Sequence, residues 1–195
     1  MGFFYVIWIK KNTDMKPILI IFFGSFIFSN AIGQVPVEVT PTIQKKIIQN
    51  IEKEIPRFKQ QLEKEKASLP EIEFTLDTFR VERFIQEYIK LDYGDFGMRD
   101  ASYKAADRYD SLLNKYYKKL LKVLKGEDKK ILIQSQKSWL AFRNNEIKLV
   151  ELISKDQYSG GGTMQQLTES SMYMDLIKNR TIAIFEHYTR ATQGY

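Results

Sequence analysis

Two polar residues, Gln136 and Arg143, lie where the helical repeat of this chain favours apolar side chains. Large apolar residues recur around them at spacings of three and four, which predicts a helix with one dry face. The residues of that face are Leu132, Trp139, Leu140, Ile147 and Val150. A buried guanidinium or amide without a partner costs several kcal/mol, so both must be paired. The chemistry predicted here is hydrogen bonding and charge pairing around Trp139, the expected core anchor.

The partners of these side chains are expected on neighbouring helices. Helical spacing places further polar residues beside the apolar stripes of the preceding and last helices. The full set is Asp110, Asn114, Gln136, Arg143, Glu146 and Arg180. We expect Asp110 or Glu146 to pair with the two arginines, while the two amides fill the remaining hydrogen-bond positions. A polar binding pocket and a satisfied structural network both remain open, and the structural network is favoured.

Catalysis is not predicted. The single histidine, His187, has no identified acid or nucleophile as a partner. Carboxylates such as Glu52 and Glu54 lie on charged helix faces, and no set of residues has the spacing of zinc ligands. The glycine run Gly160–Gly162 lacks the strand and the Lys-Ser/Thr pair of a phosphate-binding loop. We therefore expect a non-enzymatic protein with no metal and no cofactor.

Composition points to a globular protein of ordinary size. The chain has 195 residues, no cysteine and a formal net charge of +6. Leaving out residues 1–33, with three lysines and one aspartate, lowers that charge to +4. Nucleic-acid binders usually concentrate more positive charge on one face, so no nucleic-acid partner is expected. The lysine-rich run Lys115–Lys125 could be a membrane or nucleic-acid surface, but its leucines fit the stripe of a core helix better.

The first 33 residues predict a signal peptide. Lys16, a short apolar run over 18–28 and small residues before Gln34 match its charged, apolar and cleavage regions. The run is shorter than the ~20 residues of a membrane span, so cleavage after Gly33 is favoured over an anchor. Translation is expected to begin at Met15, because residues 1–14 are unusual ahead of such a signal. We expect a periplasmic or secreted protein that meets a membrane only through an uncleaved N-terminus.

The remaining sequence predicts an all-α, antiparallel helical bundle. Residues 34–70 read as a helical extension and linker, with Pro56 expected to kink or end the helix and a boundary near Pro70. Residues 71–78 alternate like a strand and are expected to form an extended segment. Later helices are expected near 78–89, 99–125, 127–155 and 163–188. Helices 99–125 and 127–155 form a long antiparallel hairpin, against which 163–188 packs as a third helix.

The glycine-rich loop over 156–163 is the candidate partner-binding segment. Its residues are Asp156, Gln157, Tyr158, Gly160, Gly161 and Gly162. Exposed loops commonly carry binding residues, and a tyrosine can anchor such a contact.

Residues 71–192 resemble the lysozyme inhibitor LprI-like family of small helical envelope proteins. The resemblance rests on DSLLNKYY at 110–117, QKSWLAFR at 136–143, the Gly161-Gly162-Thr163 loop and LIKNR at 176–180. Family members commonly carry cysteines where this chain has Ile147 and Met172, and another near Ser102. The resemblance implies an exported protein that binds lysozyme or another envelope protein. It also suggests that core packing between the second and third helices replaces the missing cross-link. The alternative is a scaffold module that contacts peptidoglycan, a membrane surface or another protein.

Overall fold

The computed structural model describes residues 7–11, 14–18 and 35–193. The chain divides into a unit of residues 1–35 and a compact unit of residues 36–195. In the first unit, β1 (Ile7–Lys11) and β2 (Asp14–Ile18) pair antiparallel. The predicted cleavage site after Gly33, and the apolar run beyond residue 18, lie outside the described residues.

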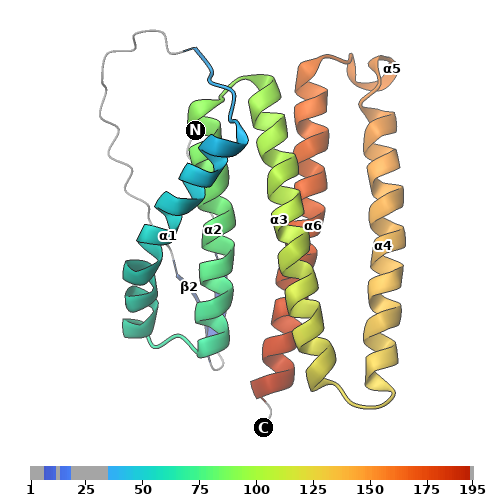
Figure 1. Cartoon of the computed structure of the whole chain (residues 1–195). Coiled ribbons are helices and arrows are strands. Elements are labelled where there is room, and N and C mark those ends of the chain that lie inside the picture. Colours follow the sequence, from blue (N-terminus) through green and yellow to red (C-terminus); the bar gives the residue numbers. More distant parts are fainter. Residues whose placement is uncertain (1–6, 12–13, 19–34, 194–195) are drawn as a thin grey trace. The chain divides into compact units, whose positions relative to one another are not determined.

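The second unit is an all-helical bundle, as predicted (Figure 1). Its elements are α1 (Pro41–Lys64), α2 (Leu69–Leu91), α3 (Asp95–Val123), α4 (Asp128–Ile153), α5 (Asp156–Ser159) and α6 (Thr163–Gln193). The helices α2, α3 and α4 alternate in direction, and α6 runs parallel to α3 (Figure 1). The most extensive contact between two helices joins α3 to α6.

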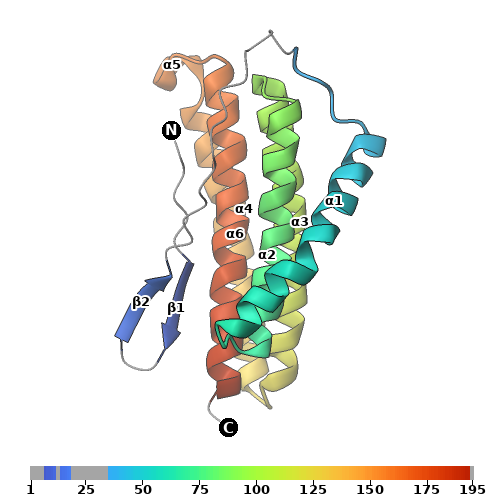
Figure 2. The ribbon, with the colours of Figure 1, turned by 90° about the vertical axis from the view of Figure 1, so that its left-hand side faces the viewer.

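The N-terminal helix α1 packs on α2 within this same unit. Thr40 caps it, Pro41 occupies its first turn, and the helix continues past Pro56 rather than ending there. The backbone N–H of Val37 donates to the carbonyl of Leu91 over 2.8 Å, and Val39 is buried against α1 and α2. Figure 2 shows α1 crossing α2 at an angle. Residues 36–70 are therefore packed into the bundle, and the expected boundary near Pro70 is only a turn between two helices.

The expectation of an extended segment over 71–78 is wrong, because α2 already begins at Leu69. Ser68 and Glu71 form a capping box: each side chain accepts a hydrogen bond from the other's backbone N–H. The helix lies between two neighbours and is buried on two sides. Ile72 packs beside Leu62 of α1, while Phe74 packs against α3 and α6. Because apolar residues such as Ile72 and Phe74 are buried on opposite sides of the helix, apolar and polar residues alternate in the sequence as they do in a strand.

Small side chains allow α3 to lie close to its neighbours. Ala101, Ala105 and Ala106 on α3 are fully buried, as are Ser170 and Thr181 on α6. The hydroxyl of Thr181 donates to the backbone carbonyl of Tyr109 across the two helices over 3.1 Å. A large residue at these positions would force the helix backbones apart.

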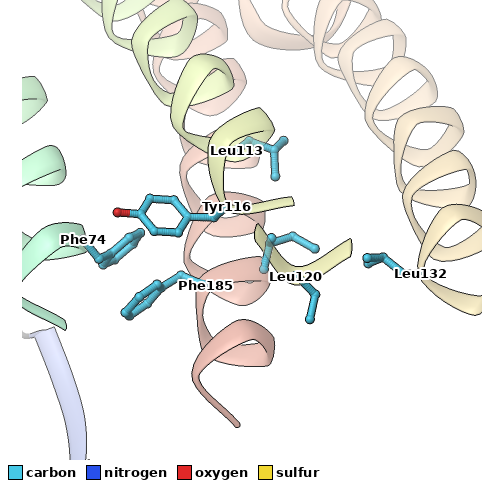
Figure 3. Packing of buried hydrophobic residues seen from close by; sticks show 7 residues of the cluster. Phe74, Leu113, Tyr116, Leu120, Leu132 and Phe185 are labelled. Atoms are coloured by element: carbon cyan, nitrogen blue, oxygen red, sulfur yellow. The ribbon is translucent and has the colours of Figure 1, made fainter. Parts of the chain in front are cut away.

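An aromatic cluster joins three helices below this region (Figure 3). The rings of Phe74 and Phe185 stack with centroids 3.9 Å apart, and Tyr116 meets both rings edge-on at 5.0 and 5.3 Å. These three side chains come from α2, α6 and α3, so the cluster fixes the relative positions of these helices.

The helix α4 is much more exposed than the sequence predicts. Leu132 is its one fully buried residue; Trp139 is half-buried and Leu140 is exposed. A short turn at Gly126 connects α3 to an antiparallel α4, as predicted, but α4 makes only limited contact with α6. The bundle thus has a tight part, α2–α3–α6, and a loosely attached helix.

Phe185→Ala should lower the free energy of unfolding by about 3 to 5 kcal/mol, because it removes a buried ring from the aromatic cluster. Urea unfolding followed by circular dichroism measures this loss. The matched control is Phe142→Ala, since Phe142 is 52% exposed on α4 and its removal should cost less than about 1 kcal/mol. Equal losses for the two variants would contradict this account of the core.

Alkaline pH should destabilise the fold in part through Tyr116. Burial and its hydrogen bond to Asp77 over 2.7 Å raise the pKa of the Tyr116 hydroxyl. The folded state therefore keeps a proton that the unfolded chain releases, so this contribution is complete below about pH 10 and is lost as pH rises further. Tyr116→Phe should flatten the fall in unfolding free energy above about pH 10 by up to about 1.4 kcal/mol per pH unit. Urea titrations at a series of pH values test this, and equal slopes for both proteins would contradict it.

Candidate functional site

The predicted polar set comes together around Trp139, but only in part. Arg180 of α6 donates from Nε to Gln136 and from Nη2 to Ser135 on α4, each over 3.0 Å. The guanidinium carbons of Arg143 and Arg180 lie 5.4 and 5.8 Å from the indole centroid of Trp139. Burial lowers the pKa of Arg180. This group links α4 to α6 and is half-buried rather than enclosed.

The expected pairing of Asp110 or Glu146 with the arginines is wrong for the described residues. The carboxylate of Asp110 accepts from Asn114 on the same helix over 3.0 Å, and Arg143 donates to the side chain of Asn144. Glu146 is half-buried on α4 and has no ion pair within the described part of the chain. The loose packing of α4 explains this, because a hydrated guanidinium does not need a buried carboxylate.

The polar links between tightly packed helices lie elsewhere, at residues outside the predicted polar set. Glu82 of α2 accepts hydrogen bonds from Tyr109 of α3 and from Lys178 of α6, the latter over 2.7 Å. Each of Glu82 and Lys178 directly follows a buried core residue, Val81 and Ile177. That adjacency is the one sequence signal that could have suggested this network.

A second network ties α2 to α3 through the lysine-rich run. Lys115 pairs with Glu73 over 2.9 Å and also with Asp77, while Lys119 pairs with Glu73. Burial alone would raise the pKa of Glu73, but the hydrogen bonds from Lys119 and Lys115 outweigh it and lower that pKa. These two lysines neutralise neighbouring carboxylates, which supports the core-helix interpretation of this run.

The candidate binding loop has a defined structure, a one-turn helix followed by the glycine run. Residues 156–159 form the one-turn helix α5, which Gly160 ends with a positive φ of 76°. A Cβ on Gly161 would lie 1.9 Å from the Asp156 carboxylate, so a larger residue would displace that side chain and would also strain the positive φ of this position. The Ser159 hydroxyl donates to the carbonyl of Ser154 over 2.9 Å. These contacts hold the loop in one shape and leave Tyr158 60% exposed.

A cavity of about 390 Å³ lies between α3, α4 and α6, near the end of the bundle that carries α5. Three carboxylates line it, from Asp107 of α3, Glu151 of α4 and Glu169 of α6. The rings of Tyr103 and Tyr173 form an aromatic wall, with centroids 6.1 Å apart. This site could not be predicted from the sequence, because its residues come from three helices and show no common motif.

The positions of the missing family cysteines border this same region. Ile147 is half-buried and lines the cavity, while Met172 is 42% exposed. The expectation that these two residues replace a cross-link by core packing is therefore wrong. The separation of α4 from α6 at this level explains why the space between them remains open.

Within 7–11, 14–18 and 35–193, no group of three or more His, Cys, Asp or Glu residues could hold a metal ion. Over the same ranges, no helix has the length and apolar character needed to cross a membrane.

Arg180→Met should destabilise the fold more than Arg143→Met. The first change removes two hydrogen bonds between α4 and α6 and should cost about 1 to 3 kcal/mol. The second removes contacts to an exposed neighbour on the same helix and should cost less than about 1 kcal/mol. Chemical denaturation of both variants measures the difference, and the reverse order would contradict the assigned contacts.

A comparison with known protein families finds a match within the helical bundle. Residues 92–183, which span α3, α4, α5 and most of α6, match the family model described as "Lysozyme inhibitor LprI". Searches of curated proteins and of solved structures find no match. The match begins after α2, later in the chain than the resemblance over 71–192 suggested. Over residues 92–183, which are 92 of the 195 residues of the chain, the sequence is similar to the lysozyme inhibitor LprI family.

Proposed function

We propose that this protein is an exported, non-enzymatic protein that binds and inhibits a lysozyme in the cell envelope. The observation that carries the proposal is the family match, which includes the whole α5 turn. That turn presents an exposed tyrosine on a backbone held by its own contacts. A preformed aromatic projection loses little conformational entropy on binding, which suits insertion into the cleft of an enzyme.

Within the turn, Tyr158 and Asp156 have different roles. Tyr158 is the exposed side chain that would contact the enzyme. Asp156 lies against Gly161 and shapes the turn, so changing it alters the backbone as well as the charge. An experiment on the contact surface must therefore change Tyr158 alone.

Tyr158→Ala should weaken inhibition by about tenfold to a hundredfold, as expected for an aromatic anchor at the centre of an interface. The measurement is the rate of peptidoglycan lysis by a panel of lysozymes, with increasing amounts of the purified protein. Phe142→Ala is the matched control, because it removes an exposed aromatic side chain from the middle of α4. Equal inhibition by Tyr158→Ala and wild type would reject the α5 turn as the contact. Absence of inhibition across all lysozyme types would reject the function.

A second candidate, an envelope scaffold, is favoured by the outer surface of α4. Ile131, Phe142 and Leu149 are exposed there at helical spacing. Lys137 and Lys148 are exposed on the same helix. An apolar stripe beside lysines suits an anionic membrane or cell-wall surface. Sedimentation with anionic vesicles or cell-wall sacculi at low and high salt separates this function from lysozyme inhibition, because salt weakens such binding.

A further inference from the structure

The cavity between α3, α4 and α6 combines two features that recognise organic cations. Its three carboxylates, from Asp107, Glu151 and Glu169, come from three different helices, and its lining contains no lysine or arginine. Its wall carries two tyrosine rings, whose faces attract a cation. The volume of about 390 Å³ lies within the range of ligand pockets, which is about 300 to 1,000 Å³.

The carboxylates of this cavity have no side-chain partner among the described residues, unlike those that join the helices of the bundle. Elsewhere, Glu52 pairs with Arg80, Glu54 with Arg83 and Glu82 with Lys178. None of the three cavity side chains makes an ion pair or a side-chain hydrogen bond within residues 35–193. The cavity therefore concentrates uncompensated negative charge in a molecule whose formal net charge is +6.

The position of the cavity connects it to the α5 turn. Glu151 lies in the last turn of α4, just before α5, and Glu169 lies in the second turn of α6, just after the glycine run. A partner protein that contacts Tyr158 would also have surface close to these carboxylates. The α5 turn lies between the end of α4 that carries Glu151 and the start of α6 that carries Glu169 (Figure 1).

We propose that this cavity receives an arginine or lysine side chain of a basic partner protein. The proposal rests on the proposed function for the identity of that partner, a basic animal lysozyme. Its cation would lie against the tyrosine faces and neutralise the three carboxylates. Two basic proteins repel each other at long range, and this repulsion opposes binding of a basic lysozyme to this chain. A contact at the acidic cavity would offset it. At physiological salt that repulsion is screened beyond about 8 Å, so local attraction can dominate at contact.

The direct test uses N-acetyl-arginine amide as a probe of the cavity, followed by NMR of the purified protein. The probe should shift the resonances of Ile147 and Tyr173 saturably at about millimolar concentrations, as expected for one side chain without its protein. The uncharged N-acetyl-norleucine amide should cause no saturable shift. The triple variant D107N/E151Q/E169Q should bind the arginine probe at least about tenfold more weakly. The control E127Q/D128N/E186Q makes the same charge change on exposed residues outside the cavity and should bind as wild type does.

The second arm measures inhibition of a basic animal lysozyme with the same variants. The cavity variant should inhibit at least about tenfold less well than wild type, and the control variant should inhibit normally. Inhibition that is equal in all three proteins overturns the inference, as does arginine binding that survives in the cavity variant or is absent from wild type. If the wild-type protein inhibits no lysozyme but still binds arginine in the cavity, the proposed function fails and the cation site stands.

Discussion

Close packing of α3 against α6 is the constraint on which the rest of the structure depends. Ala105 and Ala106 of α3 pack in one cluster with Ile177 of α6, and the hydroxyl of Thr181 on α6 reaches the backbone of α3. Small residues bring the two helix axes together, so the aromatic rings below them can interlock with Phe74 of α2. Three helices are thereby fixed, and the charged networks at Glu82 and Asp77 join them at the surface of this core.

The same constraint accounts for the exposure of α4. Because the small and aromatic faces of α3 and α6 are already used against each other and against α2, few buried positions remain for a fourth helix. Leu132, Trp139 and the hydrogen bonds from Arg180 attach it. Beyond these contacts, α4 stands far enough from α6 to leave the cavity beside Ile147. The features assigned to binding therefore lie where packing is weakest, which is common for functional regions.

Much of the fold could be predicted from the sequence. The bounds of α3, α4 and α6 follow from apolar spacing and from the stops at Gly126 and Gly160–Gly162. The start of α2 could not be predicted from periodicity, because a helix buried on opposite sides repeats its apolar residues much as a strand does. The capping pair Ser68 and Glu71 was the better signal there. Local hydrogen-bond chemistry is thus more informative than apolar pattern for a helix between two neighbours.

The candidate site was harder to predict, because pairing depends on burial and on helix separation, which sequence spacing does not provide. The arginines at 143 and 180 lie near Trp139 as expected, yet half-burial leaves them without the carboxylates that full burial would have required. At the cavity, by contrast, carboxylates from three helices line one space and have no cationic partner. Each of them alone resembles an ordinary solvated residue. Their shared position between loosely packed helices, beside the α5 turn, follows from the fold and cannot be read from the sequence around any one of them.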